Sequence, residues 1–296
     1  MQITNNLNRD IIEAPDWFHK AIQDKPEDKI LADPLGNVSY SKWVSKNTNQ
    51  NLIILIHGTG AHKKWWDPIA PQLKDVGNII AIDLPGMGCS DFREKYRIKD
   101  FGECVISIIK KEISDHNIKK VCIVGHSLGG HVAGYVASER KDLITDLVII
   151  DTFIRPPGYD PSQHKGGPLR MIKYYPDKET ILNRFRLMPK QECQNDWYVR
   201  YIAEHSIKKT KNGWRWRFDD VLFTSLERLF DYKFSFTCPA LFVHGSESLL
   251  TNGHILENIK NTYSDIMDFF EVLEAYHHVP LDKPIEIVKI IKERFD

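Results

Sequence analysis

One serine lies in a sequence context that could make it a nucleophile. Ser127 is the third residue of GHSLG, residues 125–129, which fits the pattern G-x-S-x-G. A short apolar run at 121–124 precedes the motif, and a helical pattern at 128–138 follows it. A sharp turn between a strand and a helix lifts a serine above the sheet, where the helix dipole and free backbone N–H groups favour an oxyanion. The sequence therefore predicts that Ser127 is a catalytic nucleophile.

The segments around this motif alternate between strand and helix patterns. Short apolar runs are typical of strands that are buried on both faces of a mostly parallel sheet. They lie at 52–56, 79–82, 121–124, 147–150, 240–243 and 269–273, after an expected β-hairpin at 29–32 and 38–44. Helical patterns lie at 66–73, 101–113, 129–138 and 285–295. This order predicts an α/β fold with a mostly parallel eight-stranded sheet and helices on both of its faces.

The alternation stops between residues 155 and 237. This stretch contains no buried-strand run, and it begins with a Pro/Gly-rich loop at 156–158 and 166–168. Aromatic residues are frequent in it, and helical periods lie at 180–186, 196–205 and 221–230. We expect a helical cap at 155–237 that is inserted between two parts of one core, 1–154 and 238–296. The two ends of such an insertion lie close together in space.

Further motifs resemble those of the α/β-hydrolase superfamily, and the resemblance extends over nearly the whole chain. The segment HGTG, residues 57–60, ends the strand expected at 52–56 and resembles the HG oxyanion motif of that superfamily. The resemblance implies that the backbone N–H groups of Thr59 and Leu128 together form an oxyanion hole. The segment DLPGMGCS, residues 83–90, resembles the superfamily's structural D-x-x-G-x-G-x-S turn.

More closely, the chain resembles a little-characterised group of bacterial serine hydrolases with a helical cap. The shared segments are Ala-His at 61–62, Trp-Trp at 65–66, RFRLMP at 184–189 and GWRW at 213–216. This resemblance implies the fold and a hydrolytic site, but it does not imply a substrate.

The general base is expected between the last strand and the closing helix. His277 and His278 both lie there, where hydrolases of this fold carry their histidine. The family pattern of a histidine followed seven residues later by a proline selects His277, because Pro284 is at that spacing. The near-neutral pKa of histidine suits a general base. His278 remains the alternative base.

The acid of the expected Ser-His-Asp triad has two candidates. The superfamily usually carries it in a G-x-x-D pattern after the penultimate strand, but Ser248 stands at that position here. Glu247 is adjacent. Asp151 lies directly after the strand expected at 147–150. This strand ends at the same edge of the sheet as the penultimate strand, so Asp151 could reach the same histidine. We favour Asp151 over Glu247, and an Asp that only fixes the loop is the alternative reading.

These residues together predict acyl transfer. His277 would take the proton of Ser127 as its hydroxyl attacks an ester-like carbonyl, and water would then hydrolyse the acyl-enzyme. We expect Trp65 and His126 to border the pocket and the substrate to be small and mainly apolar. Two alternatives remain open: carbon–carbon bond hydrolysis or cofactor-free perhydrolysis by the same triad, and a non-catalytic ligand-binding protein with a degraded triad.

The bulk composition indicates a soluble protein that acts on a small molecule. Lys and Arg together number 40, as do Asp and Glu, and this balance favours neither nucleic acid nor an anionic membrane as partner. Five unpatterned cysteines and a polar start at residues 1–10 favour the cytoplasm. No spacing predicts a metal site, and the chemistry needs no cofactor. We expect a monomer or a homodimer.

Overall fold

The computed structural model describes residues 13–47, 50–155, 173–227 and 232–295. Three features of the sequence interpretation lie outside these residues. They are the polar start at 1–10, the Pro/Gly-rich loop at 156–158 and 166–168, and the end of the helical pattern at 221–230.

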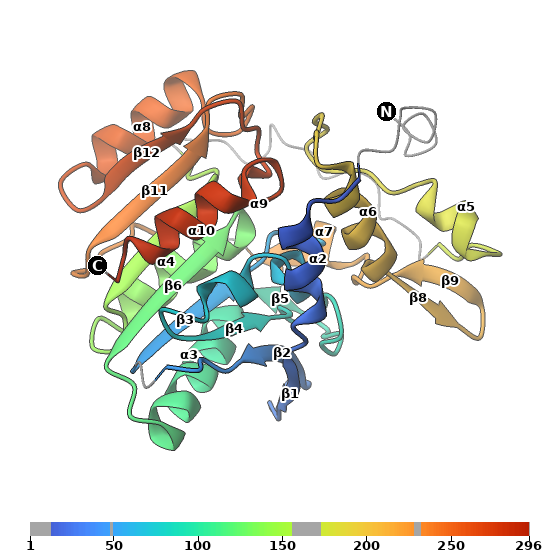
Figure 1. Cartoon of the computed structure of the whole chain (residues 1–296), viewed down its shortest axis with the longest axis horizontal. Coiled ribbons are helices and arrows are strands. Elements are labelled where there is room, and N and C mark those ends of the chain that lie inside the picture. The colour runs from blue at the N-terminus through green and yellow to red at the C-terminus, as the bar shows by residue number, and fades with distance from the viewer. Residues whose placement is uncertain (1–12, 48–49, 156–172, 228–231, 296) are drawn as a thin grey trace.

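An eight-stranded sheet runs through the molecule in the order β1-β2-β4-β3-β6-β7-β11-β12 (Figure 1). Six strands, from β4 to β12 in this order, pair in parallel, whereas β2 is antiparallel to both of its neighbours. The strands are β1 (Glu27–Leu31), β2 (Val38–Trp43), β3 (Asn51–Ile56), β4 (Asn78–Ile82), β6 (Lys120–His126), β7 (Asp146–Ile150), β11 (Ala240–Gly245) and β12 (Asp268–Val272). The predicted sheet, with its opening hairpin, is confirmed.

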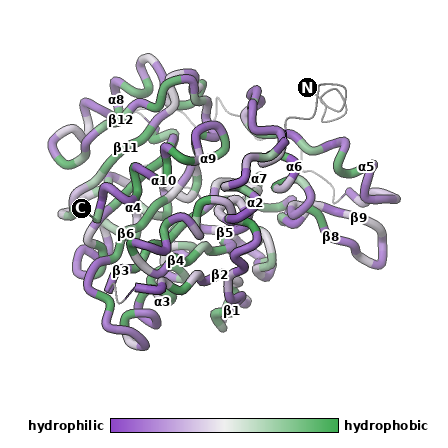
Figure 2. The backbone as a smooth tube through the Cα atoms, in the orientation of Figure 1, coloured by the Kyte–Doolittle hydropathy of each residue, from purple (hydrophilic) through white to green (hydrophobic). Residues whose placement is uncertain are grey.

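Helices cover both faces of the sheet, because side chains of one strand point alternately to opposite sides. Ile54 of β3 packs in the core with α3 and α4, whereas Ile53 and Leu55 pack in the core with α10. The helices around the sheet are α3 (Ile98–Asp115), α4 (Leu128–Glu139), α8 (Gly253–Tyr263), α9 (Val279–Asp282) and α10 (Pro284–Lys292), with α2 (Asp16–Gln23) before β1. Figure 2 shows the most hydrophobic stretches in central strands such as β3 and β6.

The single helix predicted at 66–73 is wrong. Two short 3-10 helices stand there instead, η1 (Lys63–Trp66) and η2 (Ala70–Leu73). Pro68 and Pro71 lie in this stretch, and a proline has no backbone N–H to donate to a continuous helix. Each short helix still buries apolar residues, and their spacing therefore resembles that of one continuous helix.

The chain leaves the sheet after β7 and returns at β11, and we call the part between them the insertion. It contains α5 (Lys178–Leu182), α6 (Asp196–His205), α7 (Leu222–Ser225) and a hairpin of β8 (Ile207–Thr210) and β9 (Gly213–Trp216). A further short strand, β10 (Leu226–Glu227), pairs with β5 (Tyr96–Arg97). In Figure 1, α5, α6 and the hairpin lie beyond the end of the sheet to which the parallel strands point.

The hairpin in the insertion is an element that the expectation of a mostly helical cap did not include. Lys211 and Asn212 form its turn, between the paired residues Thr210 and Gly213. Gly213 has a φ of 114°, which other residues rarely adopt. The division of the chain into a core at 1–154 and 238–296 and a cap at 155–237 stays a prediction.

None of the helices in the described part of the chain combines the length and the apolar character that a membrane span requires.

Two glycines let α4 cross β6 and β3 at very short distance. A Cβ atom added to Gly125 would lie 2.1 Å from the carbonyl oxygen of Gly129. One added to Gly129 would lie 2.3 Å from the carbonyl oxygen of Ile56. Both obstacles are backbone atoms, which cannot rotate away as a side chain can. The turn between β6 and α4 therefore depends on glycine at both positions.

Gly125→Ala should destabilise the fold severely, by more than about 3 kcal/mol, because overlap with backbone forces β6 and α4 apart. Gly253→Ala is the matched control. Gly253 has nothing within 4 Å of an added Cβ but has a φ of 47°, so only the left-handed conformation is penalised, by about 1 kcal/mol. Urea unfolding followed by tryptophan fluorescence measures both. Equal losses in the two variants would contradict the close-contact explanation.

Candidate active site

Ser127 stands at the turn between β6 and α4 in a strained backbone conformation. Its φ is 55° and its ψ is −117°, outside the regions that residues with a side chain normally occupy. Its backbone N–H donates to Ile150 O at 2.9 Å, and its carbonyl oxygen accepts from Thr152 Oγ1 at 3.0 Å. These bonds to the end of β7 hold the strained residue in place. The serine is partly exposed, so solvent and small molecules can reach it.

Asp151 and His277 meet in the interior, next to this turn. Nδ1 of His277 lies 2.8 Å from Oδ1 of Asp151, and the two side chains are 3% and 0% exposed. Asp151 follows β7 directly, with a φ of 42°, and its N–H donates to Val243 O of the neighbouring β11. With Nδ1 donating to the carboxylate, Nε2 of His277 carries the free lone pair. This is the tautomer that a general base requires.

Three more donors hold the carboxylate of Asp151. Ser248 Oγ donates to Oδ1 at 2.7 Å, while Gly245 N and Thr251 Oγ1 donate to Oδ2 at 3.0 and 2.8 Å. Ser248 and Thr251 are both almost completely buried. The serine at the superfamily's usual acid position thus donates a hydrogen bond to Asp151, the candidate acid after the earlier strand. The sequence identified Ser248 as a departure from the superfamily pattern, but it did not predict the hydrogen bond from Ser248 to Asp151.

Glu247 has a different environment. It is exposed, and its Oε1 accepts from the neighbouring Ser246 Oγ at 3.2 Å. Its backbone N–H donates to Ala275 O. Of the two candidate acids, the structure thus brings Asp151, and not Glu247, into hydrogen-bond contact with His277.

His126 ties the nucleophile turn to the loop that carries His277. Its Nε2 donates to the carbonyl oxygen of His277 at 2.9 Å, and the centres of the two rings lie 4.8 Å apart. Since His126 immediately precedes Ser127, this bond places the hydroxyl-bearing turn and the base-bearing loop side by side. The two segments are 151 residues apart in the sequence.

The loop at 57–60 lies against the nucleophile. A Cβ added to Gly58 would lie 3.1 Å from Ser127 Cβ. The ring of His57 fixes this loop, because Nδ1 donates to Gly58 O at 2.7 Å and Nε2 accepts from Leu84 N at 3.1 Å. Thr59 is partly exposed, and Leu128 is the first residue of α4, where backbone N–H groups have no partner within the helix. Of the predicted oxyanion residues, Leu128 directly follows Ser127, and Thr59 directly follows Gly58, which approaches it.

Aromatic rings surround these residues. Trp65 stacks over His126 with ring centres 6.5 Å apart and lies 5.3 Å from the ring of His278. Phe218 and Phe223 of the insertion pack against Gly60, where a Cβ would lie 3.2 Å from Phe223 Cζ. The sequence interpretation did not single out either phenylalanine as a neighbour of Gly60, because their approach depends on how the insertion folds back on the core.

Several histidines of this region are neutral because they are buried. Burial lowers the pKa of His57 to about 4 and, together with the nearby His277, lowers that of His126 to about 3. Burial also holds the pKa values of His62 and His278 well below the usual range. One ring nitrogen from each of His126, His277 and His278 lies within 4.8 Å of the other two, an arrangement that could hold a metal ion and that sequence spacing did not reveal.

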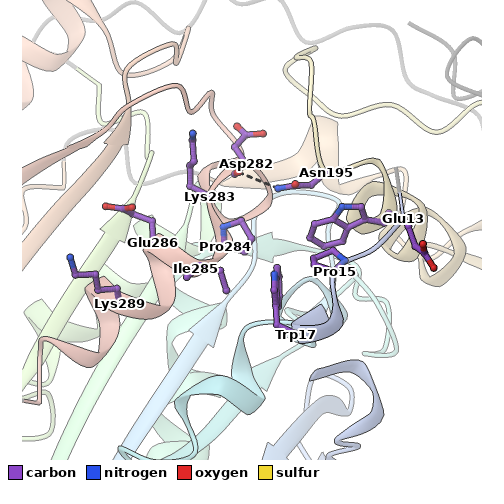
Figure 3. Close-up of a pocket in the computed structure, with 11 residues that line it drawn as sticks. Glu13, Pro15, Trp17, Asn195, Asp282, Lys283, Pro284, Ile285, Glu286 and Lys289 are labelled. Atoms are coloured by element: carbon purple, nitrogen blue, oxygen red, sulfur yellow. Dashed lines mark hydrogen bonds between the residues drawn. The ribbon is translucent and has the colours of Figure 1, made fainter. Parts of the chain in front are cut away.

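A surface pocket of about 550 Å³ lies behind the His277 loop, between α2, α6 and α10 (Figure 3). Trp17, Trp197 and Asp282 are among its lining residues, whereas Ser127, Asp151 and His277 are not. Asp282 accepts from Tyr276 N at 2.8 Å, and burial raises the pKa of its carboxyl to about 6. The pocket therefore adjoins the loop without opening onto the candidate triad.

Comparison with known proteins covers most of the chain. The sequence model of the family described as alpha/beta hydrolase fold matches residues 51–284. A Haemophilus influenzae protein named as an esterase/lipase is 26% identical over 274 residues, 89% of each chain. An esterase of Mycobacterium tuberculosis is 23% identical over 273 residues, 88% of this chain and 87% of the relative. Among solved structures, E-2-(acetamidomethylene)succinate hydrolase superposes with a TM-score of 0.74 at 20% identity, over 92% of this chain and 99% of that one. That last likeness bears on the fold alone.

The buried histidines should make the fold sensitive to acid. A histidine with a lowered pKa in the folded state binds fewer protons there than in the unfolded chain, where it titrates near pH 6.5. The free energy of unfolding should therefore fall as the pH falls below about 6.5, by about 1.4 kcal/mol per pH unit for each such ring. The contribution of His57 to this fall continues down to about pH 4, and that of His126 continues down to about pH 3.

His62→Phe tests this dependence, because it removes one buried neutral ring. The slope of the free energy of unfolding between pH 6.5 and 5 should become shallower by about one proton, or about 1.4 kcal/mol per pH unit. His254→Ala on the surface of α8 is the control and should leave the slope as it is. Urea unfolding at several pH values gives the slopes, and an unchanged slope in His62→Phe would rule out this contribution.

Proposed function

The chain belongs to the alpha/beta-hydrolase fold family, and from this premise we propose that it is a serine hydrolase that cleaves an ester bond of a small, mainly apolar substrate. It is a hydrolase like its relatives, which are named as esterases. The observation that carries the proposal is the buried 2.8 Å hydrogen bond between His277 Nδ1 and Asp151, next to the strained turn of Ser127.

The proposed reaction begins with proton transfer. Nε2 of His277 takes the proton of the Ser127 hydroxyl while Oγ attacks the ester carbonyl carbon. The positive charge that develops on the imidazole is stabilised by the carboxylate of Asp151, which stays ionised. The protonated ring then gives its proton to the leaving alcohol, and an acyl group remains on Ser127. Water, activated by the same ring, releases the acid and restores the serine.

The tetrahedral intermediates need donors for their negative oxygen. We assign this role to the backbone N–H groups of Thr59 and Leu128. Their support is the contact of Gly58 with Ser127 and the position of Leu128 at the start of α4, where the positive end of the helix dipole faces the site. The ring of His57 keeps the loop in this orientation through its two backbone hydrogen bonds.

The substrate preference is inferred from the surroundings of the serine. Trp65 and His126 present stacked rings on one side, and Phe218 and Phe223 pack at the oxyanion loop on another. Phe223 is 39% exposed, so part of an apolar ring remains available to a ligand. Such walls favour a modest apolar group over a charged one.

The hydrogen bonds around Asp151 also argue against a degraded, non-catalytic site. The departure at Ser248 was the only feature of the sequence that favoured that alternative. A hydroxyl that donates to Asp151 at 2.7 Å is a reason to retain serine there, because an additional carboxylate at this distance would repel the first.

Removal of the nucleophile or the base should abolish activity. Ser127→Ala and His277→Ala should each lose covalent labelling by a fluorophosphonate probe and lower the kcat for short-chain p-nitrophenyl esters by at least about a thousandfold. Gel fluorescence and a spectrophotometric assay measure the two effects. The proposal fails if Ser127→Ala keeps either property while the protein is folded.

The two candidate acids can be separated by isosteric variants. Asp151→Asn should lower kcat by about a thousandfold or more, because an amide favours the wrong tautomer of His277. Glu247→Gln is the matched control and should keep most of the wild-type rate. Thermal denaturation of both variants checks that the folded state is preserved. The reverse pattern of rates would move the acid to Glu247.

A further inference from the structure

Three histidine rings converge next to Ser127, and the proposed reaction uses only one of them as a base. His126 ends β6, whereas His277 and His278 precede α9. One ring nitrogen of each lies within 4.8 Å of the other two, and all three side chains are buried. The proposed acyl transfer gives no task to His278.

The hydrogen bonds of these rings leave lone pairs free. Nε2 of His126 donates to the carbonyl oxygen of His277, which leaves Nδ1 as its free nitrogen. Nδ1 of His277 donates to Asp151, which leaves Nε2 free. His278 is 5% exposed, and within the described residues neither of its ring nitrogens has a hydrogen-bond partner. Burial of a polar ring without partners is unfavourable, so a missing ligand would explain it.

We propose that His126, His277 and His278 form a binding site for a divalent transition-metal ion, with Zn²⁺ as the best match. Neutral imidazole nitrogen is a preferred ligand of Zn²⁺ and Cu²⁺. Zinc binds nitrogen at about 2.1 Å, so tetrahedral ligand nitrogens lie about 3.4 Å apart. The three ring nitrogens lie at most 4.8 Å apart, so they would need to close by no more than about 1.4 Å to reach this separation.

The outer contacts of two rings are those of metal ligands. A metal-bound histidine usually donates its other N–H to a carboxylate or a backbone carbonyl, which fixes its tautomer and orientation. His277 donates to the carboxylate of Asp151, and His126 donates to a backbone carbonyl. The tautomers of these two rings are thereby fixed before any ion arrives. Three protein ligands leave at least one coordination position for water.

Metal binding at this site would block the proposed reaction. The ion takes the lone pair of His277 Nε2, which is the group that accepts the proton of Ser127. Hydrolysis should therefore be inhibited reversibly by Zn²⁺ and restored by a chelator. This consequence rests on the proposed function, whereas the binding itself does not.

Binding is measured first, without reference to activity. Purified protein competes with a chromogenic chelator for Zn²⁺ at neutral pH, and the wild type and Ser127→Ala should each bind one ion per chain. His278→Phe keeps the shape of the ring but not its nitrogens, and should weaken binding at least about tenfold. His278→Cys replaces the ligand by a thiolate and should retain binding. His254→Ala, on the surface, is the control and should bind as the wild type does.

Wild-type affinity in His278→Phe, or the absence of stoichiometric binding in the wild type, would overturn the site. The inhibition arm follows with p-nitrophenyl esters. The Zn²⁺ concentration for half inhibition should rise in His278→Phe by the same factor as the dissociation constant. Equal inhibition of both proteins, or activation by Zn²⁺, would overturn the inhibitory role. A protein that binds Zn²⁺ as expected but cleaves no ester would refute the proposed function and leave the metal site intact.

Discussion

The candidate site depends on one buried hydrogen bond, from His277 to the carboxylate of Asp151. A carboxylate that is fully removed from water is strongly destabilised unless donors replace its hydration. Here the donors come from several segments: the end of β11, the residues after it, and the loop before α9. Because one side chain collects these bonds, the ends of β7 and β11 and the histidine loop are fixed relative to one another. Precise placement of the base follows from the need to satisfy a buried charge.

The candidate nucleophile, Ser127, is held by a different kind of constraint. Ser127 has a backbone conformation that is unfavourable for a residue with a side chain, and such strain persists only where the surroundings determine it. Gly125 and Gly129 allow β6 and α4 to approach closely, and Ile150 and Thr152 bind the backbone of Ser127. His126 then connects this rigid turn to the histidine loop. Packing positions the serine, whereas electrostatics positions the histidine.

This difference explains what the sequence could predict. The sheet and the turn at Ser127 are encoded locally, in apolar runs and a five-residue motif, and both were predicted. Asp151 was favoured because β7 ends at the same edge of the sheet as β6. The support from Ser248 could not be predicted, since the direction of its hydroxyl depends on the turn after Gly245. The β8–β9 hairpin has only Gly213, directly after its turn, as a local signal, and the frequent aromatic residues of the insertion obscured it. Phe218 and Phe223 reach Gly60 only through the fold of the whole insertion, and no local pattern encodes that.

The insertion holds the histidine loop through hydrogen bonds of its own. Gln191 accepts from His278 N and donates to Asp282, and Asn195 donates to Leu281 O at 2.7 Å. Tyr198 donates to Trp65 O at 2.6 Å, and Trp65 stacks on His126. These contacts link α6 and the residues before it to both the nucleophile turn and the base. Since these hydrogen bonds hold the neighbours of His277 in place, displacement of α6 would disturb the position of the candidate base.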